Sequence, residues 1–206
     1  MEDKQLEIIN KSALLFLKNG IKSVTMDDLA KELGVSKKTI YKYFDDKNDL
    51  ITKIVEIKTS LDRQACKEAR SDSENAIDAL FKISEFVSEM MQNVHSSVFF
   101  DLQKYHRDAW EVMEEHKRNF VKSQIQENVE RGQDEGLYIP YLNAEVIASI
   151  YISTMDGLFD GETFDLDAFS FKKIFDEIIH FQIRGIANDK GLTYLNNRIK
   201  KQKDRK

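Results

Sequence analysis

The chain has 206 residues, of which 41% are hydrophobic and 33% are charged, and its formal net charge is −5. This balance is typical of a globular protein with its own core, and it excludes a disordered or low-complexity chain. The single cysteine excludes an internal disulfide, and the sequence shows neither a signal peptide nor an apolar run of about eighteen residues, so we expect a cytoplasmic protein without a membrane partner.

Helix-forming residues dominate the whole chain. It contains eight glycines and one proline, and its stretches rich in Leu, Ile, Glu and Lys show no strand-like alternation of apolar and polar residues. We therefore predict an all-α fold.

The first predicted helix covers residues 3–19. Apolar residues recur there at helical spacing, and the pattern ends at Asn19 and Gly20. Because the next two predicted helices are too short to be stable alone, we expect the first helix to cover them.

Residues 25–44, TMDDLAKELGVSKKTIYKYF, contain two short helical patterns around a tight turn. Thr25 stands at an N-cap position with Asp28 three residues later, which is the spacing of a capping box. Gly34 suits the left-handed residue that ends a helix, and Ser36 suits the cap of the next helix. The spacing predicts a helix-turn-helix.

The second helix of this motif carries the predicted DNA contacts. If Ile40 and Phe44 face the core, the step of about 100° per residue places Lys38 and Lys42 on the opposite face. Lysines neutralise phosphates or bond guanine in a major groove, and hydroxyl groups add donors. The candidate DNA-binding residues are Thr25, Ser36, Lys37, Lys38, Thr39, Tyr41, Lys42, Tyr43 and Lys47, the last as a phosphate contact.

The acidic net charge does not argue against DNA binding. Residues 1–58 carry 11 basic and 10 acidic side chains, so the excess of acid lies in the rest of the chain. A local cationic surface is therefore expected in an acidic protein.

The segment GVSKKTIYKYF followed by DDKNDL closely resembles the helix-turn-helix of TetR-family transcriptional regulators, and the resemblance spans about residues 5–58. It implies a homodimeric, ligand-responsive repressor with a three-helix, homeodomain-like DNA-binding domain and a larger helical domain for ligand binding and dimerisation. Many relatives have a small residue where this chain has Lys38, so the base preference stays open.

We expect four segments along the chain. They are a helix-turn-helix domain (1–46), a connecting helix (47–72), a helical ligand-binding and dimerisation domain (73–190) and a basic C-terminal tail (191–206). Ser73 is the expected cap of the helix after the connecting helix, and the tail from Arg198 is expected to be solvated and frayed.

Residues 97–133 concentrate bulky side chains in helices that break near residues 105–107. Such residues can line an apolar pocket for a small apolar effector, although any one of them, taken singly, is more often part of a core. The candidate ligand-binding residues are Met91, Phe99, Tyr105, Trp110, Met113 and Phe120.

Two further helices are predicted, one from Asn143 and one from near Asp167. The apolar residues of the second span roughly 200° of the helix, about twice the stripe of a helix with one buried face. One face can pack on its own domain and the other on a partner chain, where the resemblance places a two-fold four-helix interface. The candidate dimerisation residues are Ile147, Ile150, Thr154, Phe171, Phe175, Ile178 and Gln182.

No motif in the sequence indicates an enzyme, a cofactor or a metal site. The four histidines lack ligand spacing, and no phosphate-binding or nucleophile motif occurs. The leading hypothesis is a repressor released from a palindromic operator by a small apolar ligand. Two alternatives stay open: a dimeric DNA-binding regulator without a ligand, and a helical enzyme or carrier with a small-molecule pocket.

Overall fold

The computed structural model describes residues 3–92, 94–95, 97–159, 163–165 and 168–203. Its secondary-structure elements are helices, which confirms the all-α prediction. The described residues also contain an isolated β-bridge between Tyr138 and Ala187. They are α1 (Asp3–Asn19), α2 (Met26–Leu33), α3 (Lys37–Tyr41), α4 (Lys47–Ser71), α5 (Ala76–Met91), α6 (Ser97–Tyr105), α7 (Arg107–Glu115), the π-helical turn η1 (His116–Val121), α8 (Lys122–Asp134), α9 (Ala144–Phe159), α10 (Phe171–Ile186) and α11 (Asp189–Lys203).

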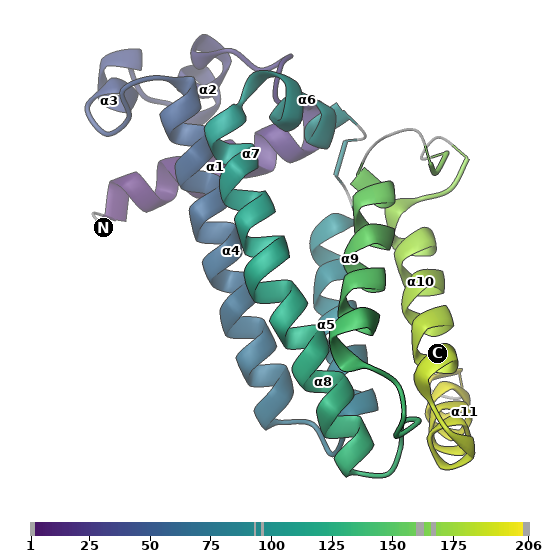
Figure 1. Cartoon of the computed structure of the whole chain (residues 1–206). Helices are drawn as coiled ribbons and strands as arrows, with labels where there is room; N and C mark the ends of the chain where they lie inside the picture. The colour runs from purple at the N-terminus through teal and green to yellow at the C-terminus, as the bar shows by residue number, and fades with distance from the viewer. Residues whose placement is uncertain (1–2, 93, 96, 160–162, 166–167, 204–206) are drawn as a thin grey trace.

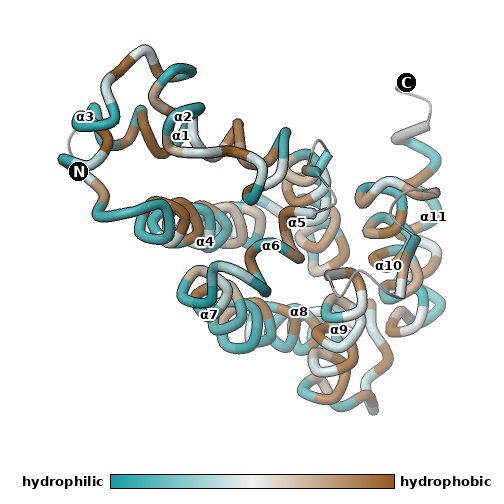
Figure 2. The backbone as a smooth tube through the Cα atoms, turned by 90° about the horizontal axis from the view of Figure 1, so that it is seen from above, coloured by the Kyte–Doolittle hydropathy of each residue, from teal (hydrophilic) through white to brown (hydrophobic). Residues whose placement is uncertain are grey.

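Helices α1–α3 gather at one end of the molecule, and α4 starts there and runs the length of the structure (Figure 1). Helices α7, η1 and α8 follow one another along α4, and α5, α9 and α10 complete the bundle. Figure 2 views several of these helices nearly along their axes and shows α4 beside α7 and α5 beside α10. No helix in the described ranges is long and apolar enough to cross a membrane.

The local signals of the helix-turn-helix are confirmed. Thr25 caps α2 and forms a capping box with Asp28, and Gly34 closes the helix with φ of 65°. Ser36 caps α3 by accepting a hydrogen bond from the backbone N–H of Thr39 at 3.1 Å. Asp46 caps α4 in the same way, with its carboxylate accepting from the N–H of Asp49 at 2.9 Å.

Two hydrophobic cores hold the chain together. The first joins the buried faces of α1–α4 to Val98, Leu102 and Ala109 of α6 and α7. These three residues lie beyond position 72, in the segment that the sequence assigned to the larger domain. Helices α1–α3 together have too little apolar surface to form a core alone, so α6 and the start of α7 complete the core of the helix-turn-helix.

The second core joins α5, α8, α9, α10 and α11, which we call the body. Tyr138 is fully buried there, and its ring lies against α8 at Gly132. A Cβ atom at Gly132 would lie 2.0 Å from the ring, so a glycine is required inside this helix. Glycine has a poor helical propensity, but the close approach of the Tyr138 ring explains why α8 contains a glycine at position 132.

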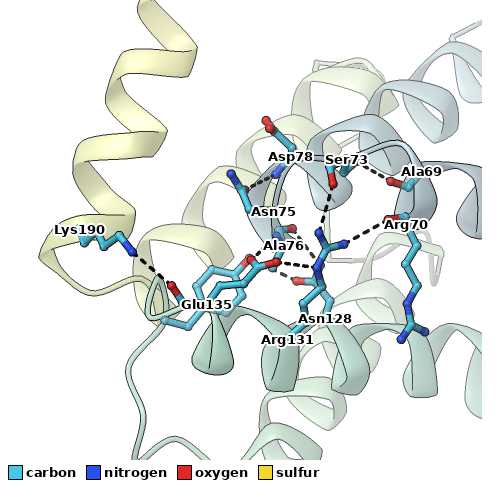
Figure 3. Close-up of polar contacts among 11 residues, drawn as sticks. Ala69, Arg70, Ser73, Asn75, Ala76, Asp78, Asn128, Arg131, Glu135 and Lys190 are labelled. Atoms are coloured by element: carbon cyan, nitrogen blue, oxygen red, sulfur yellow. Dashed lines mark hydrogen bonds and ion pairs between the residues drawn. The ribbon is translucent and has the colours of Figure 1, made fainter.

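Polar contacts tie the ends of three helices together at the far end of the body (Figure 3). Arg131 of α8 donates to the carbonyl oxygens of Arg70 and Ser73, each at 3.2 Å, and its Nε lies 2.7 Å from Glu135. Glu135 in turn accepts from the N–H of Ala76 at 2.8 Å. These bonds satisfy backbone groups that helix ends leave without partners inside the helix.

Two predicted helix starts differ from the structure or fall outside it. Ser73 does not cap α5; its hydroxyl donates back to the carbonyl of Ala69, and Asn75 is the cap, accepting from the N–H of Asp78 at 3.1 Å. Both residue types favour the cap position, so sequence could not choose between them. The predicted start near Asp167 lies outside the described residues, and α10 itself begins at Phe171 with Ser170 as its cap.

The prediction of a loose tail is wrong for the described residues, because α11 continues to Lys203. Leu195 is fully buried against the body, and the hydroxyl of Tyr194 donates to Asp78 at 2.5 Å. The guanidinium of Arg198 lies 3.1 Å from Asp78 and 4.6 Å from the centre of the Phe81 ring. The basic composition of this segment suggested an exposed tail, whereas its few apolar residues form a stripe that packs against the body.

Candidate DNA-binding surface and apolar cavity

Helix α3 presents the face that the sequence predicted. Ile40 and Phe44 are buried, whereas Lys38 and Lys42 are exposed on the other side and Tyr41 is 47% exposed. Lys42 lies 5.2 Å from the centre of the Tyr43 ring. Neither Lys38 nor Lys42 has an acidic partner within the described residues, so both ammonium groups are available to an anionic ligand.

Three other candidates hold the motif together. The ammonium of Lys37 lies 2.6 Å from Asp27, which raises the pKa of Lys37. The hydroxyl of Thr25 donates to Asp28 at 2.6 Å, and the hydroxyls of Ser36 and Thr39 lie 2.9 Å apart. The structure therefore places Thr25, Ser36 and Lys37 in the bonds that shape the helix-turn-helix.

Lys47 differs from its predicted role as a free phosphate contact. Its ammonium donates to the carbonyl oxygens of Ile21 at 2.6 Å and Val24 at 2.5 Å, and it lies 5.5 Å from the Phe16 ring. Burial lowers the pKa of Lys47. The loop between α1 and α2 folds over the start of α4, and helical spacing along α4 contains no information about that path.

The joint between this domain and the rest contains polar contacts that the sequence did not indicate. Nδ1 of buried His106 lies 2.5 Å from Oδ1 of Asn48, and the carboxylate of buried Asp101 accepts from the N–H of Lys22 at 2.9 Å. Burial lowers the pKa of His106, and the charge of Lys47 lowers it further. These residues bond the start of α7 and the middle of α6 to the DNA-binding end of the molecule.

An apolar cavity of about 260 Å³ lies where the two cores meet. Phe16 and Leu17 of α1 line it, as do residues of α4–α6 and of α8–α10. Among the predicted ligand-binding residues, Met91, Phe99 and Met113 line this cavity. This volume lies just below the usual range of ~300 to 1,000 Å³ for ligand pockets, which suits a small organic ligand.

The other three predicted ligand-binding residues lie elsewhere. Tyr105 is 41% exposed and bonds Lys22, Trp110 packs against the core of the helix-turn-helix, and Phe120 stacks on His116. The chain turns between α6 and α7 and again at the π-helical turn, so aromatics that are close in sequence point to different surroundings. The composition of residues 97–133 could locate a cluster of bulky side chains, but it could not show which of them point into the cavity.

The cavity also has polar residues in its wall that sequence analysis missed. These are Lys58, Thr59 and Asp62 of α4, His116 and Lys117 of η1, and Gln124 of α8. Nε2 of His116 lies 2.5 Å from Oδ2 of Asp62, and the ammonium of Lys117 contacts Glu114 and Asp156. One signal in the sequence could have indicated them: Lys58 and Asp62 are four residues apart on the apolar side of a predicted helix, where charged residues are unexpected.

A second concave surface lies on the outer side of the body, between α9 and α10, with a volume of about 590 Å³. It is lined by the predicted dimerisation residues Ile147, Ile150, Thr154, Ile178 and Gln182, and by Phe169, Phe181 and Gly185, which were not predicted. Phe181 is 82% exposed and Ile150 57% exposed. Large apolar side chains exposed together are typical of a protein interface.

Phe171 and Phe175 do not belong to this surface. Both line the inner cavity, and Phe175 is only 3% exposed. Helix α10 has apolar residues on two faces, and the sequence could show that two faces exist without showing which one turns inward. The assignment of Phe171 and Phe175 to dimerisation is therefore corrected.

Comparisons with known proteins agree with this geometry. Residues 8–54 match the family model described as bacterial regulatory proteins, tetR family. The HTH-type transcriptional regulator YvaF of Bacillus subtilis (strain 168) is 25% identical over 170 residues, which cover 81% of this chain and 87% of YvaF.

Two solved structures share the fold. A TetR-family transcriptional regulator from Agrobacterium tumefaciens superimposes with a TM-score of 0.73 at 17% identity, covering 90% of this chain and 98% of that one. SmeT, a repressor from Stenotrophomonas maltophilia solved as a complex with triclosan, gives a TM-score of 0.68 at 13% identity, covering 91% of this chain and 93% of SmeT. The helix-turn-helix segment therefore matches the tetR family of bacterial regulatory proteins, and the whole chain is similar in fold to TetR-family transcriptional regulators.

Proposed function

We propose that this regulator is a homodimeric repressor that leaves a palindromic operator when a small apolar molecule enters the cavity. The observation that carries the proposal is the position of the cavity, because residues of α1 and α4 form part of its wall. A ligand there touches helices that also build the core of the helix-turn-helix. DNA contact is assigned to the exposed face of α3, with Lys38, Tyr41 and Lys42.

The proposed route of coupling is short. Leu102 and Val98 of α6 line the cavity and are also members of the core around the helix-turn-helix. Helix α4 begins at the DNA-binding end and contributes Ile51, Ile54 and Val55 to the same wall. A ligand lowers the affinity for DNA only if it binds better to a conformation in which the two α3 helices mismatch the operator. We assign residues 47–72 the role of transmitting this change.

A second chain is the proposed occupant of the outer surface between α9 and α10. That surface exposes Phe181 and Ile150, and a two-fold axis would bring the same surface of two protomers together. A dimer also presents two copies of α3 to half-sites about 34 to 36 Å apart, or a multiple of that. SmeT, which shares the fold and was solved as a complex with triclosan, supports the ligand-responsive part of the proposal.

The test begins with operator selection from random DNA by the full-length protein, followed by anisotropy titrations with and without a panel of small apolar compounds. We expect an effector to lower operator affinity about 5 to 150-fold, and the operator to lower effector affinity by the same factor. A dimeric regulator without a ligand predicts no response to any compound. Turnover of a compound by protein that ignores DNA at low salt would instead indicate an enzyme.

A cavity-filling variant makes this test specific to the cavity. Met91 lines the cavity, and the neighbouring Gln92 is exposed and does not line it. Met91→Trp should keep operator affinity and lose the response to the effector, whereas Gln92→Trp should keep both. An effector that still releases DNA from Met91→Trp would place its site elsewhere.

A further inference from the structure

An exposed group of aromatic and basic side chains lies where α6 meets the loop between α1 and α2. Its members are Lys22, Phe100, Lys104 and Tyr105, which we call the α6 patch. Phe100 is 53% exposed and Tyr105 41% exposed, and their rings meet edge to face with centres 6.4 Å apart. Large apolar groups that are exposed side by side, rather than singly, indicate a binding surface.

Two ammonium groups lie against these rings. Nζ of Lys104 lies 5.0 Å from the centre of the Phe100 ring and 5.4 Å from that of Tyr105. Nζ of Lys22 lies 4.9 Å from the centre of the Tyr105 ring and donates to its hydroxyl oxygen at 3.3 Å. Neither lysine has an acidic partner within the described ranges. Contacts with aromatic rings orient an ammonium group without neutralising it, so both charges are available to an anion.

The charge balance around the α6 patch is positive. The nearest carboxylate, that of Asp101, is 4% exposed and accepts from the backbone N–H of Lys22 at 2.9 Å. Arg107 lies 2.8 Å from Glu111, so this pair adds no net charge. The hydrogen bond from Lys22 lowers the pKa of Tyr105. Because the Tyr105 oxygen accepts this bond, its own O–H can donate to a further acceptor.

The α6 patch is attached directly to the DNA-binding end of the molecule. Lys22 lies three residues before Thr25, the cap of α2, and Lys47 from the first turn of α4 bonds two carbonyl groups of the same loop. His106, which follows the patch, bonds Asn48 of α4 at 2.5 Å. Figure 1 places α6 at the end where α2 and α3 lie, and Figure 2 looks onto that end. The patch therefore continues the surface that carries the helix-turn-helix.

Two cations and a hydroxyl donor match the backbone of duplex DNA. Phosphate oxygens accept a large share of all protein–DNA hydrogen bonds, and lysine and tyrosine are among the usual donors. The duplex carries one negative charge per ~1.7 Å of its axis, so a basic surface beside the helix-turn-helix meets phosphates whatever the sequence. An acidic protein surface would also match the charge, but continuity with the DNA-binding end favours the duplex.

We propose that the α6 patch is a second DNA-binding surface, outside the helix-turn-helix, in which Lys22, Lys104 and Tyr105 bind backbone phosphates of the operator. The inference rests on the DNA-binding part of the proposed function and adds to it a contact that reads no bases. Phe100 orients Lys104 through its ring. Because α6 also lines the apolar cavity, this contact belongs to a helix that an effector touches.

The test measures the affinity of the full-length protein for the selected operator and for random duplex DNA, by anisotropy at several salt concentrations. Lys104→Gln should weaken both DNAs severalfold, by the same factor, and reduce the salt slope by about one unit for each protomer bound. Lys104→Arg keeps the charge and should keep both quantities. Exposed Lys67 lies about 30 Å along α4 from Lys47, so Lys67→Gln is the control and should change nothing.

Tyr105→Phe separates direct contact from long-range attraction. It removes a neutral donor and no charge, so the affinity for both DNAs should fall severalfold while the salt slope stays the same. Lys104 and Tyr105 are both exposed, and the urea midpoints of their variants should equal that of the wild type.

Unchanged affinity and salt slope in Lys104→Gln, with the wild type bound to its operator, contradict the inference and leave the proposed function intact. A loss confined to the operator also contradicts it, because a phosphate contact acts on every sequence. A loss in Lys104→Gln with none in Tyr105→Phe indicates attraction without contact and contradicts it as well. The expected losses, in a protein whose operator binding ignores every compound, support the inference and contradict the ligand-responsive part of the proposed function.

Discussion

Individual lysines of the helix-turn-helix have different physical roles. We expect Lys38→Ala and Tyr41→Ala to abolish specific operator binding without unfolding the protein, because both side chains are exposed opposite buried Ile40. Loss of a base contact should relax specificity at one position by ~1 to 3 kcal/mol. Anisotropy titrations on operator and random DNA measure the loss of specific binding. Urea denaturation shows whether the variants stay folded.

Lys47→Ala should act on stability instead. Its ammonium bonds the carbonyl oxygens of Ile21 and Val24, so its removal leaves two acceptors unsatisfied and lowers the free energy of unfolding by ~1 to 3 kcal/mol. Lys38→Ala is the control and should stay within about 0.5 kcal/mol of the wild type. Unchanged stability, together with a salt slope of DNA binding reduced by about one unit, would show that Lys47 contacts a phosphate after all.

Cys66 illustrates burial of a titratable group. It is 5% exposed in the wall of the cavity, and burial raises the pKa of its thiol to about 12 from an ordinary value near 9. Because the folded state binds the thiol proton more tightly, this contribution to stability is complete below about pH 9 and is lost as the pH rises toward 12. The native protein should react slowly with a thiol reagent at pH 8, and the urea-unfolded protein rapidly; equal rates would contradict the burial.

At the scale of elements, α11 shows how tertiary contacts order a segment whose composition indicates a loose end. Leu195→Ala should cost ~2 to 5 kcal/mol of unfolding free energy, because Leu195 is fully buried against the body. Lys200→Ala, at an exposed position of the same helix, is the matched control and should change little. Similar small effects of both substitutions in urea denaturation would show that α11 is undocked in solution.

At the scale of the whole molecule, assembly depends on the outer surface of α9 and α10. Phe181→Glu and Ile150→Glu should give folded monomers with weakened operator binding, because both residues are largely exposed in the protomer and a carboxylate buried in an interface is costly. Ile178→Glu should act in the same direction. Tyr141, 84% exposed and outside this surface, provides the control Tyr141→Glu, which should leave the dimer intact. If light scattering finds that the wild type is monomeric at micromolar concentration, the dimer proposal is contradicted.

Information within a few residues was enough to predict the fold class, the capping box of Thr25, the left-handed turn at Gly34 and the exposed face of α3. These features depend on steric limits of the backbone and on hydrogen bonds that span three or four residues. The resemblance to the TetR family rested on the same short segment, and the family match covers it.

The destinations of the apolar faces and the partners of the buried polar groups depended on the tertiary structure. Phe175 turns inward and Phe181 outward on one helix, and the ring of His116 meets Asp62 from 54 positions away. Lys47 finds its carbonyl partners 23 and 26 positions earlier in the chain. Helical periodicity defines which side of a segment is apolar, but the packing of distant helices decides what each side touches.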